Sequence, residues 1–122
     1  MSKVPSTPGD ERYREVAELK AALDEHAIVA ITDSQGKIIY VNDKFCETSG
    51  YRREELLGQT HHIISSGMHP KSLFSELWST ISNGNIRRGE ICNKTRDGRL
   101  FWVDGAIVPL HDAQGKIMRY IS

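Results

Sequence analysis

Two stretches of the chain place apolar residues three and four positions apart, which is the spacing of a helix with one apolar face. In the first stretch, from Asp10 to His26, the apolar positions are Tyr13, Val16, Leu19 and Leu23. In the second, which starts at Pro70 and runs through Ile81, they are Leu73, Phe74, Leu77, Trp78 and Ile81. We expect an amphipathic helix in each stretch, and the second has the stronger apolar face.

Short segments rich in β-branched residues predict five strands. They cover residues 28–32, 37–41, 86–95, 99–110 and 116–122. Glycine-containing turn sequences at residues 33–36, 96–98 and 112–115 join them into hairpins. Between the second and third strands, Asn42 can cap a short helix that ends at Gly50, and residues 52–57 can form one further turn. This order of elements predicts an α+β fold, an antiparallel sheet with helices on one face.

The chain length of 122 residues suffices for one hydrophobic core, so we expect a single domain. Residues 1–9 are polar and contain two prolines, a composition that predicts a disordered leader. The helix of residues 10–26 would then flank a domain of residues 27–122. Its apolar stripe can pack on the domain's own sheet or pair two copies of the chain, and both alternatives stay open.

Charge and cysteine content narrow the partners and the compartment. Sixteen basic residues balance sixteen acidic ones, so no net field draws the protein to nucleic acid or to a membrane surface. No apolar run approaches the roughly 20 residues that a membrane crossing needs. Cys46 and Cys92 stand in no disulfide or metal-type spacing. We therefore expect a cytoplasmic module without direct membrane contact.

Five segments, in their order and spacing, resemble a PAS domain from about Glu25 onward. They read ITDSQGKIIYVNDKFCETSGY, REELLGQ, KSLFSELWSTI, GEICNKTRDGRLFWVDGAIVP and DAQGKIMRYIS. The resemblance implies a five-stranded antiparallel sheet in the order 2-1-5-4-3, with helices on one face and a ligand pocket between them. It also implies a sensory role in signal transduction, for example in a two-component system. The output domain, such as a kinase or a cyclase, would lie elsewhere in the same polypeptide.

The segments HHIISSGMHP, LWSTI and GEICNKTRDG resemble more narrowly the PAS domains of redox and oxygen sensors that hold FAD. For such a flavoprotein, Trp78, Phe45 and Ile91 could form the walls of a flavin slot and Asn93 could meet the polar edge of the ring. Asn93 lies two residues from Ile91, so both side chains point to the same face of a strand. Alternatively, Trp78 and Phe45 are ordinary core residues, and Asn93 is satisfied by backbone or solvent.

Two positions depart from flavin-binding patterns. Similar flavin-binding sequences carry Trp before the Gly-Glu step of the third strand, where this chain has Arg87. The guanidinium would point to water or to phosphate, or flavin is absent. In the light-sensing LOV subgroup a cysteine attacks the flavin, and here His61 stands in its place, so no such adduct can form.

Other chemistry receives little support from the sequence. Haem-binding PAS domains ligate iron through a histidine on the long helix, whereas here only His69, just before that helix, is a candidate, so haem is not expected. The spacing of His61, His62 and His69 fits no known metal site. No nucleophile elbow or phosphate loop is present, and we expect no enzyme activity. The rival function is a ligand-free PAS module that forms a homodimer and relays signals through the helix of residues 10–26.

Overall fold

The structure of the protein is a computed structural model that describes the backbone of residues 8–122 and the side chains of residues 13–122. The predicted leader of residues 1–9 therefore lies mostly outside the described residues. The helices are α1 (Pro8–His26), α2 (Asp43–Ser49), α3 (Arg53–Leu56), the 3₁₀ helix η1 (His61–Ile64) and α4 (Lys71–Ser82). The strands are β1 (Ala30–Asp33), β2 (Ile38–Val41), β3 (Arg87–Lys94), β4 (Leu100–His111) and β5 (Ile117–Ile121). None of the described helices is both long and apolar enough to span a membrane.

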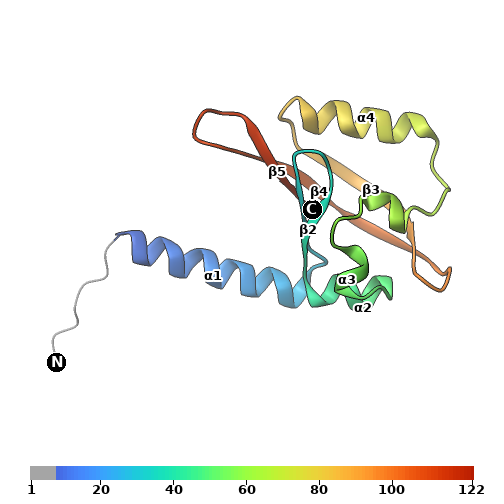
Figure 1. Ribbon diagram of the computed structural model, residues 1–122, viewed down its shortest axis with the longest axis horizontal. Helices are drawn as coiled ribbons and strands as arrows, with labels where there is room; N and C mark the ends of the chain where they lie inside the picture. Colours follow the sequence, from blue (N-terminus) through green and yellow to red (C-terminus); the bar gives the residue numbers. More distant parts are fainter. Residues whose placement is uncertain (1–7) are drawn as a thin grey trace.

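The five strands form one antiparallel sheet in the order β2-β1-β5-β4-β3 (Figure 1). This confirms the predicted α+β class, the strand order and the meander formed by the last three strands. The central strand β5 pairs with both β1 and β4, so the first and last strands of the domain lie side by side in the middle of the sheet. Strand β3, which follows α4, is left at one edge.

The three hairpin turns are built in the same way. At the first residue of each turn a side-chain oxygen accepts from backbone N–H groups further along the turn. Asp33 Oδ1 and Asp112 Oδ1 each accept from the residues two and four positions later, and Thr95 Oγ1 accepts from the residue four positions later. The fourth residue of each turn is a glycine with φ of 89°, 92° and 81° in Gly36, Gly98 and Gly115. Only glycine adopts such positive φ values without an energetic penalty.

The hydrophobic core is divided into two clusters. The first lies under β1 and β2 and consists of Ala30, Ile38, Val41, Phe45, Leu56 and Ile64. The second joins α4 to the sheet and consists of Leu77, Ile81 and Tyr120, with Ile91, Ile107 and Ile117 packed against it. Hydrophobic burial therefore holds α2 and α3 against β1 and β2, and holds α4 against the last three strands.

Helix α1 projects away from the domain (Figure 1). Its last turns are tied to β2, because the Tyr40 hydroxyl donates to the carboxylate of Asp24 and Lys20 lies over the Tyr40 ring, 4.9 Å from its centroid. The apolar stripe stays exposed, with exposed fractions of 84%, 64%, 65% and 49% for Tyr13, Val16, Leu19 and Leu23. The stripe does not pack on the domain's own sheet, so the first of the two alternatives is excluded.

A single buried amide, that of Asn42, joins α1, β1 and α2. Its Oδ1 accepts from the backbone N–H groups of Val29, at 3.1 Å, and Phe45, at 3.0 Å, while its Nδ2 donates to the carbonyl of Ala27 at 2.7 Å. Asn42 is 2% exposed. Water therefore cannot replace these three hydrogen bonds without opening the structure.

We expect Asn42→Ala to lower the free energy of unfolding by about 2–4 kcal/mol, because it removes a helix cap and leaves buried polar backbone groups without partners. Denaturant titration followed by circular dichroism measures the change. Asn85→Ala at an exposed position is the matched control and should cost less than about 0.5 kcal/mol. Equal effects of the two substitutions would contradict the role given to Asn42.

Candidate functional site

Alternate residues of β3 and β4 face α4. Ile91 and Ile107 pack against Leu77 and Ile81 of α4, so their sides of the two strands form the face that α4 covers. We call this side the inner face. Because strand residues two apart point the same way, the unbroken register of β3 with β4 assigns the remaining positions. The inner face carries the cross-strand pairs Arg87↔Ile107, Gly89↔Gly105, Ile91↔Val103 and Asn93↔Phe101.

The inner face of β3 and β4 is not filled by the protein's own side chains. Ile91, Asn93, Phe101 and Val103 are each only partly buried, whereas Ala30 and Ile38 on the same side of β1 and β2 are each 1% exposed. At Gly105 an added Cβ atom would meet no atom within 4 Å. Open space therefore lies over Gly105, which is itself exposed to solvent, in a position that a planar apolar ligand could occupy.

Asn93 supplies the polar group of this face. Its side-chain amide makes no hydrogen bond to the side chains and backbone that the structure describes, and it stays half-buried beside Ile91 and Phe101. An amide in such surroundings gains most from a partner that both donates and accepts. The prediction that Ile91 and Asn93 share a face is confirmed by the register, and no backbone contact satisfies the amide.

The outer edge of β3 is covered by the segment that joins η1 to α4. Ser65 forms a β-bridge with Asn93, and His69 Nε2 accepts from the backbone N–H of Cys92 at 2.9 Å. The His69 ring stands edge-on to Phe74, at 6.2 Å between centroids, and to Trp102, at 5.8 Å. Because Nε2 accepts, this geometry assigns the neutral ring with its proton on Nδ1. We call residues 65–69 the edge strap.

His61 lies beside the first core cluster. It begins η1, which Thr60 caps by accepting from the N–H of His62, and its ring stands edge-on to Phe45 at 6.3 Å between centroids. His61 is exposed to solvent. The protein atoms around its ring still desolvate it in part, which lowers its pKa below the ordinary value of 6.5.

The sequence matches the PAS domain family over residues 25–122. The chain belongs to the PAS domain family. Among relatives, this PAS domain is 37% identical over 100 residues to the nitrogen fixation regulatory protein of Klebsiella oxytoca, covering 80% of this chain and 20% of that protein. It is 34% identical over 99 residues to the aerotaxis receptor of Escherichia coli K12, covering 81% of this chain and 19% of that protein. The chain thus spans about one fifth of the length of these relatives.

Solved structures share the fold of this PAS domain. An RNA-binding light-oxygen-voltage receptor superposes with a TM-score of 0.78 at 22% identity, covering 99% of this chain and 35% of that one. The dark structure of the blue-light photoreceptor Aureochrome1 LOV superposes with a TM-score of 0.74 at 21% identity, covering 99% of this chain and 83% of that one. At these identities the likeness establishes the fold.

Two of the residues predicted as flavin walls have structural neighbours of their own. Phe45 is 5% exposed within the first core cluster, where it backs the ring of His61. Trp78 is 41% exposed, stands edge-on to Tyr120 at 5.8 Å and lies across the turn at Gly36. The structure therefore pairs Phe45 with His61 and Ile91 with Asn93, and places Trp78 against the turn between β1 and β2.

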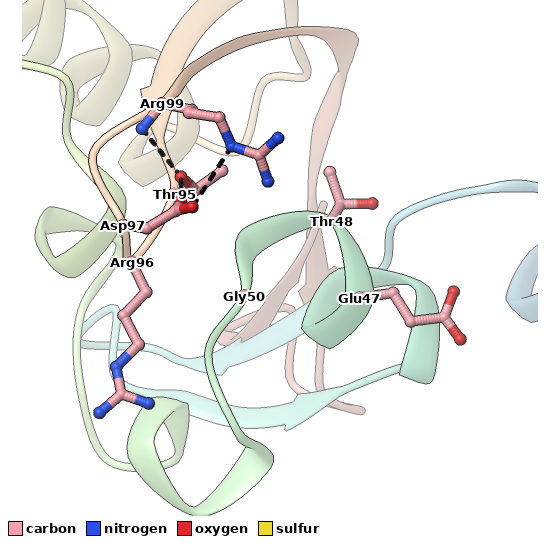
Figure 2. A pocket seen from close by; sticks show the side chains of 7 residues that line it. All are labelled: Glu47, Thr48, Gly50, Thr95, Arg96, Asp97 and Arg99. Carbon is pink, nitrogen blue, oxygen red and sulfur yellow. Dashed lines mark hydrogen bonds and ion pairs between the residues drawn. The ribbon is translucent and has the colours of Figure 1, made fainter.

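A surface hollow of about 430 Å³ opens beside the turn between β3 and β4 (Figure 2). Three of its charged groups have partners: Asp97 accepts from the Thr95 hydroxyl and pairs with Arg99 Nε at 3.4 Å, while Arg96 Nη1 lies 3.1 Å from a carboxylate oxygen of Glu55. The backbone N–H of Arg96 also donates to Ser49 at the end of α2. This hollow is a junction that fastens the hairpin to α2.

The lowered pKa of His61 predicts a pH-dependent stability. Above about pH 6.5, its ordinary pKa, folded and unfolded chains both hold the ring neutral and His61 does not affect stability. Below that pH the unfolded chain binds a proton that the folded chain does not, so the free energy of unfolding should fall as pH decreases. His61→Gln should make this fall shallower, as measured by urea titrations at about pH 7.5 and about pH 5.5.

His62→Gln, at the adjacent exposed position, is the control. An equal flattening by both substitutions would assign the effect to the segment rather than to the desolvated ring of His61. Titration of the His61 imidazole by NMR provides a second readout, and an apparent pKa at or above the ordinary value would contradict the geometry described above.

Proposed function

We propose that this PAS domain is a sensor that binds FAD on the inner face of β3 and β4 and relays its redox or ligand state to an output domain of the same polypeptide. The observation that carries the proposal is the open region over Gly105, bordered by apolar side chains and by the unpartnered amide of Asn93. The regulatory protein and the receptor among its relatives support a signalling role.

The inner face suits a flavin in shape and in chemistry. Ile91, Phe101 and Val103 offer apolar surface for a planar ring system, and Asn93 can both donate to and accept from its pyrimidine edge. Gly105 has no side chain, so a ring can approach the backbone closely at this position. The cofactor supplies the redox chemistry, while these residues orient it and separate it from bulk water.

Two sets of contacts could carry a change at the ligand outward. Asn93 pairs with Ser65 of the edge strap, which continues into α4. On the other side, His61 contacts Phe45, whose backbone N–H donates to Asn42, and Asn42 donates to Ala27 just after α1. A reoriented hydrogen bond at Asn93 or His61 would bias the positions of α4 and α1 through these contacts.

The first test is the colour of the purified protein and the effect of filling the inner face. Oxidised protein should absorb near ~450 nm, in the manner of flavins. Gly105→Val places a side chain into open space, so it should reduce bound flavin at least about tenfold without lowering the stability of the ligand-free protein. Flavin released by heat is quantified by fluorescence and identified by mass spectrometry.

Ala106→Val is the matched control, because it also ends in a valine side chain, one residue further along and on the opposite face of β4. It should leave flavin content unchanged. Colourless wild-type protein that does not bind added FAD would contradict the flavin assignment. Equal flavin loss in the two variants would contradict the inner face as the binding site.

We further propose that the chain forms a homodimer through α1, which is also the basis of the rival, ligand-free relay function. The apolar stripe of α1 is exposed along its length, although a helix that functions alone in water needs no such stripe. A second copy of α1 is a partner of matching chemistry. The two functions are compatible, since the ligand face and α1 share no residue.

The double substitution Val16→Asp and Leu19→Asp should convert dimers to monomers, because it places charges in the apolar stripe. Light scattering coupled to size exclusion measures the mass. Ala21→Asp, an exposed position on the opposite side of α1, is the control and should leave the mass unchanged. Loss of the dimer without loss of flavin supports the two separate roles, and a double variant that stays dimeric removes α1 as the interface.

A further inference from the structure

Arg87 is the one cation of residues 13–122 that is half-buried, since all other lysines and arginines in this range are exposed. Four of the exposed arginines form ion pairs, namely Arg52, Arg53, Arg96 and Arg99. Arg87, by contrast, has no carboxylate within 4.0 Å and no side-chain hydrogen bond among the residues that the structure describes. A charge withdrawn from water is normally paired, so the isolation of Arg87 needs an explanation.

The guanidinium of Arg87 lies over the bare backbone of the inner face. Its Nη1 is 3.2 Å from the position that a Cβ atom of Gly89 would occupy, so the absence of a side chain at Gly89 makes room for it. Ile107 is its cross-strand neighbour, and Ile91 follows Gly89 on the same face. The acidic residues nearest to Arg87 along the two strands are Glu90 and Asp104. They are cross-strand neighbours on the opposite face of the sheet. No acidic group of these strands therefore faces Arg87.

The spacing along β3 relates Arg87 to Asn93. Asn93 lies four positions along the strand from Gly89, which is under the guanidinium, and at about 3.3 Å per residue this is roughly 13 Å. Apolar positions fill the interval. A ligand with a planar apolar body, a polar edge at Asn93 and an anionic group at the far end would satisfy both unpartnered side chains. A guanidinium is well suited to a phosphate, because it donates two parallel hydrogen bonds.

We propose that Arg87 binds the phosphate of a flavin nucleotide that lies on the inner face of β3 and β4. This inference rests on the flavin function proposed above and adds a residue that selects nucleotide forms of flavin over riboflavin. It also accounts for an arginine at a position where similar flavin-binding sequences carry Trp. Arg87 is a binding residue in this assignment and takes no part in electron transfer.

Riboflavin and FMN make a matched pair of probes, because they differ only by the phosphate. Ligand-free protein is titrated with each, and binding is followed by the quenching of flavin fluorescence. The wild type should bind FMN about tenfold or more tightly than riboflavin, as expected for a charge-assisted hydrogen bond. Arg87→Gln should bind both equally by losing affinity for FMN alone. Arg88→Gln, one residue further on the outer face, is the control and should keep the preference.

The outcomes separate this inference from the proposed function. If the wild type binds riboflavin and FMN equally, or if Arg87→Gln keeps the preference for FMN, flavin binding stands and the role of Arg87 is overturned. If the wild type binds neither of these flavins and does not bind added FAD, both proposals are overturned. Arg87→Lys gives a further readout. Because lysine keeps the charge without the planar guanidinium, this variant should prefer FMN less than the wild type and more than Arg87→Gln. A purely structural arginine would not produce this order of FMN preference. Thermal unfolding of each variant verifies that it is folded.

Discussion

The candidate site depends on how the outer edge of β3 is satisfied. Strand β3 carries Arg87, Ile91 and Asn93 and yet lies at the edge of the sheet, where unpaired backbone groups invite pairing with other chains. The edge strap removes this problem through the Ser65–Asn93 bridge and the hydrogen bond from Cys92 to His69. With one side held by β4 and the other by the strap, β3 keeps its register, and its inner face can remain incompletely packed.

An incompletely packed inner face is costly for a domain of this size, since a void forfeits both burial and dispersion contacts. Two closed clusters offset that cost here. One fixes α2 and α3 under β1 and β2, and the other fixes α4 through Leu77, Ile81 and Tyr120. Gly105 then keeps the space above it free of side chains, and Gly89 makes room for the Arg87 guanidinium. This arrangement is what a binding module needs, because ligand burial can supply the missing contacts.

Local sequence patterns predicted most of the fold. The strand predicted at 86–95 is Arg87–Lys94, and the helix predicted to end at Ile81 ends at Ser82, because turn residues and apolar spacing mark these elements directly. They could not predict the edge strap, since the hydrogen bond between His69 and Cys92 joins residues 23 apart in sequence. Neither could they place Trp78 against Gly36 or show open space at Gly105, because both depend on where α4 lies relative to the sheet. Glycine within a strand pattern was the available signal for Gly105.

The buried amide of Asn42 relates the two proposed functions physically. It accepts from the N–H of Phe45, whose ring stands edge-on to His61, and it donates to the carbonyl of Ala27, just after α1. A shift of His61 toward or away from a ligand therefore acts on a residue already bonded to the base of α1. Because the amide is rigid and buried, that displacement is not absorbed by solvent. A dimer formed along α1 would then amplify a small change in the tilt of its base, since a helix converts a rotation at one end into a larger displacement at the other.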